Sequence, residues 1–183
     1  IEPEDRCALM GVPRSNYRFD FEIVQSPGLV TILYEWTHAY RTIPLDGRPH
    51  LPGGITLFNG DSRGRWEGNT LIVDVANLND KTWFDAHGTH HSDALHVVER
   101  WTAVDANTLQ YEATMDDPKA FTRPWRVAYP IDRIQDAGHE LFEEACYEGN
   151  HFTMDGMLSV GRDLKANGVK GRHEHTPGFY DEK

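Results

Sequence analysis

The sequence predicts an all-β protein, an antiparallel barrel of the calycin type, with a cupin-like jelly roll as the alternative. Short segments rich in β-branched and aromatic residues recur along most of the chain, and turn sequences separate them. Only one stretch near the C-terminus has helical periodicity. Several predicted strands are polar on one face and apolar or aromatic on the other. That pattern suits a barrel with a ligand-sized lumen.

The predicted elements follow one another from an N-terminal arm to a C-terminal helix. Residues 1–18 mix charge, proline and glycine and are expected to form an extended arm. Residues 19–168 form a single barrel domain with its helix, and residues 169–183 form a polar tail. Apolar residues at helical spacing over residues 154–165, followed by an Asn-Gly pair, predict the helix. The strands are expected at residues 19–25, 29–43, 55–58, 70–78, 92–104, 108–115, 125–134 and 140–148.

Charge and length limit the classes of partner. The chain has 183 residues, enough to bury a core, and a formal net charge of -11 at pH 7. Nucleic acids and anionic membrane surfaces both reward clustered lysine and arginine, so this acidic excess disfavours them. No apolar run is long enough to form a membrane-spanning helix. We therefore expect a small-molecule partner, and neither nucleic acid nor membrane.

The two cysteines leave two interpretations open. Cys7 and Cys146 lie far apart, and neither belongs to a CxxC motif that would indicate a redox or zinc site. They are either two buried thiols or one long-range disulfide that holds the N-terminal arm against a late strand. The disulfide is favoured because the arm has little else to hold it. It would indicate a periplasmic or secreted protein.

A histidine-rich segment over residues 81–101 is the first candidate for chemistry. Histidine titrates near neutral pH and binds metals, and four of the ten histidines lie here. A divalent metal ion is the one cofactor that this segment suggests. In the alternative interpretation, the histidines cap loops, stack on Trp83 and hydrogen-bond nearby aspartates. The candidate ligands are His87, His90, His91 and His96, completed by a late residue such as Glu148 or His151.

The hairpin predicted over residues 92–115 is the second candidate. Strand alternation places His96 and Arg100 on one face, and Glu112 on the partner strand can share it. Inside a barrel these residues would supply a histidine, an orienting carboxylate and a cation. Such a set can abstract a proton and stabilise an enolate. On the outside, the same residues would be a solvated sheet surface with weak ion pairs.

The leading functional hypothesis is an enzyme of the lyase, isomerase or hydratase type that acts on a small organic substrate, such as a carbohydrate derivative. Its acid–base centre would be His91 and His96, with Glu112 or Asp93 orienting the histidine and Arg100 stabilising negative charge. A metal-dependent barrel enzyme is the second hypothesis. The third is a non-catalytic barrel that only binds a ligand.

Two further patterns have both functional and structural interpretations. Aromatic residues suit a substrate pocket, although such residues more often form the core. Residues 60–64 match the GxSxG nucleophile motif, but a strand and not a helix follows, so a glycine-rich hairpin loop is favoured. The aromatic candidates for substrate binding are Tyr34, Trp36, Trp83, Trp101 and Tyr111.

Several strings together resemble a family of secreted bacterial proteins. They include DRCALMGVPR, FEIVQSPGLVTILYE, GDSRGRWEGNTLIVD, HSDALHVVERW and DDPKAFTRPW, and the resemblance covers the chain from Asp5 to about Asn150. It implies an exported protein, periplasmic or secreted, and thereby supports a disulfide between Cys7 and Cys146. It implies no particular activity and no catalytic residue.

Overall fold

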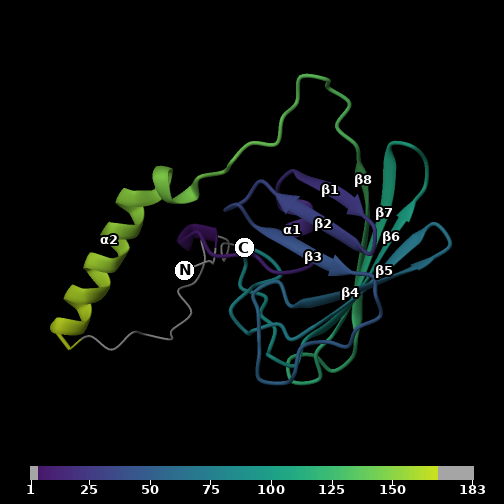
Figure 1. Ribbon diagram of the computed structural model, residues 1–183. Coiled ribbons are helices and arrows are strands. Elements are labelled where there is room, and N and C mark those ends of the chain that lie inside the picture. The colour runs from purple at the N-terminus through teal and green to yellow at the C-terminus, as the bar shows by residue number, and fades with distance from the viewer. Residues whose placement is uncertain (1–3, 169–183) are drawn as a thin grey trace, which may run out of the picture. The chain divides into compact units, whose positions relative to one another are not determined.

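The computed structural model describes residues 4–168 and has two antiparallel β-sheets (Figure 1). The prediction of a mostly β protein is confirmed. A three-stranded sheet has the order β1-β2-β3, and a five-stranded sheet has the order β4-β5-β6-β7-β8. Within the described range no ladder joins β3 to β4, so the strands form two sheets. The strands are β1 (Phe21–Ser26), β2 (Leu29–Tyr34), β3 (Tyr40–Pro44), β4 (Asp61–Glu67), β5 (Thr70–Ala76), β6 (His96–Ala103), β7 (Thr108–Asp116) and β8 (Trp125–Asp132).

The hydrophobic core lies between the inner faces of the two sheets. Alternation along β2 buries Val30, Ile32 and Tyr34, and these side chains belong to the same cluster as residues of the five-stranded sheet. Along β6, alternation buries Val97 and Trp101 in the same way. β5 is the most buried strand, with five of its seven residues buried.

The single strand expected at residues 29–43 is wrong, because two strands joined by a tight turn occupy this range. Thr37 and His38 adopt φ angles of 53° and 54°, and this left-handed conformation reverses the chain. The segment contains none of the glycine or asparagine residues that usually mark such a turn, so the turn is not predictable from the local sequence. The strand expected at residues 55–58 is also absent. One bridge, between Leu57 and Leu78, replaces it.

The N-terminal segment is folded, in contrast to the expected extended arm. It contains a 3-10 turn η1 (Glu4–Arg6) and a short helix α1 (Ser15–Arg18), and it buries Met10, Val12 and Asn16. The disulfide between Cys7 and Cys146 is confirmed, with a sequence separation of 139 residues. It joins this segment to Cys146, which follows an isolated β-bridge that pairs Glu144 with Trp36.

The C-terminal helix α2 (Cys146–Ala166) is longer than expected, and the strand expected at residues 140–148 is wrong. Within that segment Glu144 makes one isolated bridge, to Trp36, and the helix begins at Cys146. The chain divides into two compact units after Cys146. No helix among the described residues has the length and apolar character needed to cross a membrane. The predicted tail at 169–183 and the side chain of His151 lie outside the described residues.

We predict that removal of the disulfide by Cys7→Ser with Cys146→Ser lowers the free energy of unfolding by about 2–5 kcal/mol. The disulfide closes a very long loop and therefore constrains the unfolded chain strongly. Denaturant unfolding of the oxidised protein and the double variant measures the difference. Adding a reductant to the double variant should change nothing further, and equal stability of the two proteins would contradict the prediction.

Candidate acid–base site

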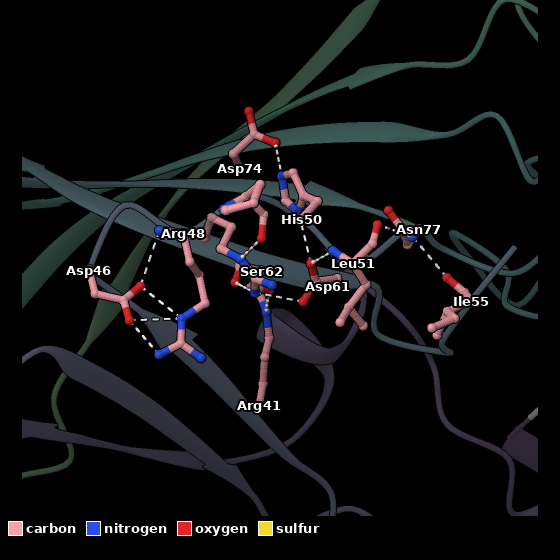
Figure 2. A network of polar contacts seen from close by, with 12 residues as sticks. Arg41, Asp46, Arg48, His50, Leu51, Ile55, Asp61, Ser62, Asp74 and Asn77 are labelled. Atoms are coloured by element: carbon pink, nitrogen blue, oxygen red, sulfur yellow. Dashed lines mark hydrogen bonds and ion pairs between the residues drawn. The ribbon is translucent and has the colours of Figure 1, made fainter. Parts of the chain in front are cut away.

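Four side chains form a continuous chain of polar contacts that we call the histidine–aspartate array: Asp61, His50, Asp74 and His96. His50 Nδ1 lies 3.0 Å from Asp61 Oδ2, and His50 Nε2 lies 2.8 Å from Asp74 Oδ1. His96 Nε2 lies 3.0 Å from the same Asp74 oxygen. Figure 2 shows His50 between the two carboxylates. Imidazoles and carboxylates thus alternate along the array.

The strand register explains why these residues meet. Asp61 and Arg63 share one face of β4, and Arg63 pairs directly with Asp74 of β5. The next strand, β6, contributes His96 on the same face as Asp74. The loop after β3 returns across this face and inserts His50 between the carboxylates. The Arg63 Nε donates to the carbonyl of Pro49 at 3.0 Å and holds the loop there.

The charges of the array follow from its hydrogen bonds. Burial raises the pKa of Asp74, but the hydrogen bonds from His96 and His50 lower it by more than burial raises it. The pKa of Asp74 therefore lies below the ordinary value of 3.8. Asp74 is therefore ionised at neutral pH and can only accept hydrogen bonds. Asp61 accepts from Arg63 Nη1 at 2.6 Å and from the Leu51 amide at 2.9 Å. A doubly protonated His50 would satisfy both flanking carboxylates at once.

A cavity of about 850 Å³ adjoins Asp61. Its volume lies within the usual range for small-molecule sites. The array reaches the cavity at Asp61, and Arg63, which donates to Asp61, also lines the cavity. The wall carries both signs of charge and many hydroxyl and amide groups. Its polar residues include Thr37, Tyr40, Arg41, Asn59, Asp61, Ser62, Arg63, Asp80 and Lys81.

Two oxygens in residues of the cavity wall are buried and have no hydrogen-bond partner within the described part of the chain. They are Thr37 Oγ1 and Asn59 Oδ1. Most buried polar atoms in proteins are paired, so unpaired ones call for an explanation. Both can accept a hydrogen bond, and Thr37 lies in the left-handed turn that shapes this end of the wall. They are suited to a ligand that brings hydroxyl donors.

Arg41 of the cavity wall forms a buried ion pair with Glu99. Arg41 Nη1 donates to Glu99 Oε1 at 3.0 Å, and its Nη2 contacts the other oxygen. Tyr111 and Asn16 donate to Glu99 Oε1 at 2.7 and 2.9 Å. Burial lowers the pKa of Arg41, but the charge and hydrogen bonds of Glu99 raise it more, so the guanidinium remains charged. Arg41 Nε also donates to Ser62 Oγ at 2.8 Å.

The structure assembles only part of the predicted cluster of His96, Arg100 and Glu112, because the register sets Arg100 opposite Glu112 while His96 lies opposite Asp116. These side chains lie on the outer face of the sheet, the second arrangement that the sequence allowed, and Val97, Glu99 and Trp101 face the core. Arg100 lies 3.7 Å from Glu67, and Glu112 lies 3.4 Å from Arg126. Asp93 instead pairs with Lys119 at 2.6 Å. The carboxylate that holds His96 is Asp74, and neither Glu112 nor Asp93 contacts it.

His91 is buried with both ring nitrogens occupied. Its Nδ1 lies 2.9 Å from the carbonyl oxygen of Ser92, so this nitrogen carries the proton. Its Nε2 lies 2.7 Å from Thr82 Oγ1 and accepts from that hydroxyl. Burial lowers the pKa of His91, which favours the neutral ring. This geometry gives His91 a role in holding the loop, and no ring nitrogen remains for a substrate.

The other predicted metal ligands do not converge. His90 packs against Trp83 with ring centroids 4.8 Å apart, and the His87 amide donates to Asp85 Oδ1 at 2.8 Å. Among the described side chains, which do not include that of His151, no three His, Cys, Asp or Glu residues form a group that could hold a metal ion. The observed geometry is that of the alternative interpretation, in which these histidines stack and the loop is capped by Asp85.

The predicted aromatic residues belong mainly to the core. Tyr34, Trp101 and Tyr111 are buried in the central cluster, and none of the three lines the large cavity. The indole of Trp36 stacks on Phe19 and donates to the Ala8 carbonyl at 3.0 Å. The GxSxG motif lies in β4 and the turn before it, so no helix follows the serine and the nucleophile elbow is absent.

Four residues of the site are not among those that the sequence predicts: His50, Asp61, Arg63 and Arg41. The segment that contains Asp61 and Arg63 was expected to be a loop because it contains several glycines. The available signal was the spacing of Asp61 and Arg63, two residues apart in a segment that leads directly into a strongly predicted strand. No local pattern marks His50, because tertiary structure alone brings it to the carboxylates.

The chain matches no family model, no curated protein and no solved structure. Function is therefore argued from the residues and their geometry.

We predict that Glu99→Gln lowers the free energy of unfolding by about 3–5 kcal/mol, because it leaves the buried Arg41 charge without a counter-ion. The matched control is Glu112→Gln on the outer face, where the pair with Arg126 is partly exposed and worth at most about 1 kcal/mol. Denaturant unfolding at neutral pH measures both. Equal losses in the two variants would refute a special role for the buried pair.

We also predict that His91 makes the fold less stable in mild acid. Its pKa is lower in the folded protein than the ordinary 6.5, so its contribution to stability is fully present above pH 6.5. That contribution is lost as the pH falls from 6.5 through the folded pKa. The free energy of unfolding at pH 7.5 and pH 5.5 should therefore differ more in the wild type than in His91→Gln. Identical pH dependence in the two proteins would contradict this assignment.

Proposed function

We propose that the protein is an exported enzyme that acts on a small hydroxyl-bearing substrate by acid–base chemistry, of the lyase, isomerase or hydratase type. The observation that carries the proposal is that Asp61 lies both in the wall of the large cavity and at one end of the histidine–aspartate array. Carboxylates and histidines that converge beside a cavity are typical of active sites.

Asp61 serves as the general base or acid, because it is the carboxylate residue that belongs both to the cavity lining and to the array. Arg63 positions Asp61 and supplies positive charge where negative charge develops on the substrate. His50 can pass a proton between Asp61 and Asp74, since each ring nitrogen faces one carboxylate. His96, whose side chain is 45% exposed, connects Asp74 to solvent. The proposed centre thus uses the types of residue that the sequence suggested, supplied by different positions.

The substrate class follows from the cavity wall. Three of its side chains are cationic and three are carboxylates, namely Arg41, Arg63 and Lys81 against Asp61, Asp80 and Asp93. A balanced wall gives no preference for a charged ligand. The unpaired oxygens of Thr37 and Asn59 accept hydrogen bonds from hydroxyl groups. A neutral carbohydrate or a related polyol derivative meets both conditions.

Export is supported by the disulfide, which persists in the periplasm or outside the cell. We further propose that the fold is related to calycin-like barrels. All neighbouring strands in both sheets are consecutive in sequence, as in an up-and-down barrel. Gly64 of β4 also approaches β3 closely, since a Cβ atom there would lie 2.7 Å from Ile43 Cγ2.

Non-catalytic binding of the same polyol class is a second candidate function. The unpaired oxygens of Thr37 and Asn59 support binding and catalysis equally, because a bound ligand would satisfy these oxygens whether or not it reacts. The two functions differ in whether Asp61 exchanges a proton with that ligand.

We predict that the protein catalyses exchange of carbon-bound hydrogen in D2O for a member of a panel of neutral keto- and aldo-sugars and sugar lactones. Proton abstraction next to a carbonyl precedes product formation in lyases and isomerases, so NMR detects the loss of the C–H signal whichever product forms. Asp61→Asn should slow this exchange by about 100-fold or more. The matched control is Asp46→Asn, which alters an exposed carboxylate paired with Arg48 in the same loop.

Equal exchange rates in the wild type and Asp61→Asn would contradict the assignment of Asp61. Binding of a sugar with no exchange for any member of the panel would favour the non-catalytic candidate. Loss of exchange in Asp46→Asn as well would show that the loop, and not the carboxylate of Asp61, is responsible.

A further inference from the structure

A second, smaller cavity of about 130 Å³ lies between the inner faces of the two sheets. The three-stranded sheet contributes Ile23, Val30 and Ile32, and the five-stranded sheet contributes Trp66, Leu71 and Trp101. None of its lining residues lines the large cavity, so the two sites are separate.

The walls of this cavity are apolar and uncharged. Eight of its ten lining residues are apolar, and the other two are Gln25 and Asn69. A charged ligand would therefore lose its hydration without gaining a counter-ion. The cavity volume is close to that of an engineered cavity of about 150 Å³ that stays dry and binds benzene. One aromatic ring therefore fits, and a peptide segment does not.

Besides Gln25 and Asn69, the walls include the indole of Trp101, which carries a buried polar atom without a partner among the described residues. This residue is 4% exposed, and its indole Nε1 is buried without a hydrogen-bond partner in the described part of the chain. An indole nitrogen can only donate. A buried donor without an acceptor is unfavourable, and a ligand with an acceptor at the right place would remove that penalty.

Access to the cavity is available beside Trp66. Its side chain lines the cavity while the residue remains 49% exposed, so the indole lies at the boundary between cavity and solvent. Its position at the mouth allows the indole to cover a bound ring, and the residues behind it, Val30, Ile32 and Leu71, are buried.

From these observations we propose that the smaller cavity binds a neutral molecule with one aromatic ring and one hydrogen-bond acceptor, such as an aryl ketone, with Trp101 Nε1 donating to the acceptor. This site is independent of the proposed acid–base function and needs no residue of the histidine–aspartate array.

The test uses two probes of the same shape on the full chain, acetophenone and α-methylstyrene, which differ only in the carbonyl oxygen. The indole N–H signals of the ¹⁵N-labelled protein are followed during titration, and Trp101→Phe assigns the signal of Trp101. As acetophenone is added, the Trp101 indole N–H signal should shift until binding is saturated, and its proton should move downfield, as expected of a new hydrogen bond. α-Methylstyrene should bind more weakly and not produce that shift.

Two further variants keep the test decisive if Trp101→Phe does not fold. Ala103→Leu narrows the cavity from an exposed strand end and should weaken acetophenone binding at least about tenfold. The matched control Ala128→Leu, an exposed alanine of β8 that does not line the cavity, should bind as the wild type does. Unchanged indole signals with acetophenone, or equal affinity in Ala103→Leu and the wild type, would overturn the proposal.

Discussion

The buried pair of Arg41 and Glu99 is the interaction on which the rest of the structure depends. Arg41 belongs to the three-stranded sheet and Glu99 to the five-stranded sheet, so the pair fixes how the two sheets face each other. Charges at this depth require partners, and Tyr111 and Asn16 complete the set around Glu99. Arg41 also binds Ser62, and alternation along β4 then directs the neighbouring Asp61 to the opposite face. A contact in the core thereby orients the candidate site.

Much of the fold is predictable from the sequence because alternation survives where one face is buried. The strands of the five-stranded sheet from β5 to β8 match the expected segments, although β7 ends one residue later, at Asp116. β4 was expected to be a loop because its segment contains several glycines, including Gly64 in the middle of the strand. The structure requires glycine there, since a Cβ atom would lie 2.6 Å from Leu45 Cδ2. The turn at Thr37 and His38 was missed because tertiary contacts, and no local turn residue, stabilise it.

The candidate site was predictable in kind more than in position. The sequence indicated a histidine, an orienting carboxylate and a cation on a β-sheet, and the array together with Arg63 contains such a set. Only His96 is common to both, because its partner Asp74 comes from a neighbouring strand and not from the predicted hairpin. His50 reaches the array through a loop whose path depends on Arg63 and Asp61. Hydrophobic periodicity carries no information about such a path.

The central claim is that Asp61 and His50 act as one acid–base unit at the large cavity. A double-mutant cycle with Asp61→Asn and His50→Gln, measured on the rate of hydrogen exchange, tests it most directly. Residues that act as a unit are strongly non-additive, so the double variant should be no slower than Asp61→Asn alone. If the two losses multiply, the residues act independently and the claim is wrong.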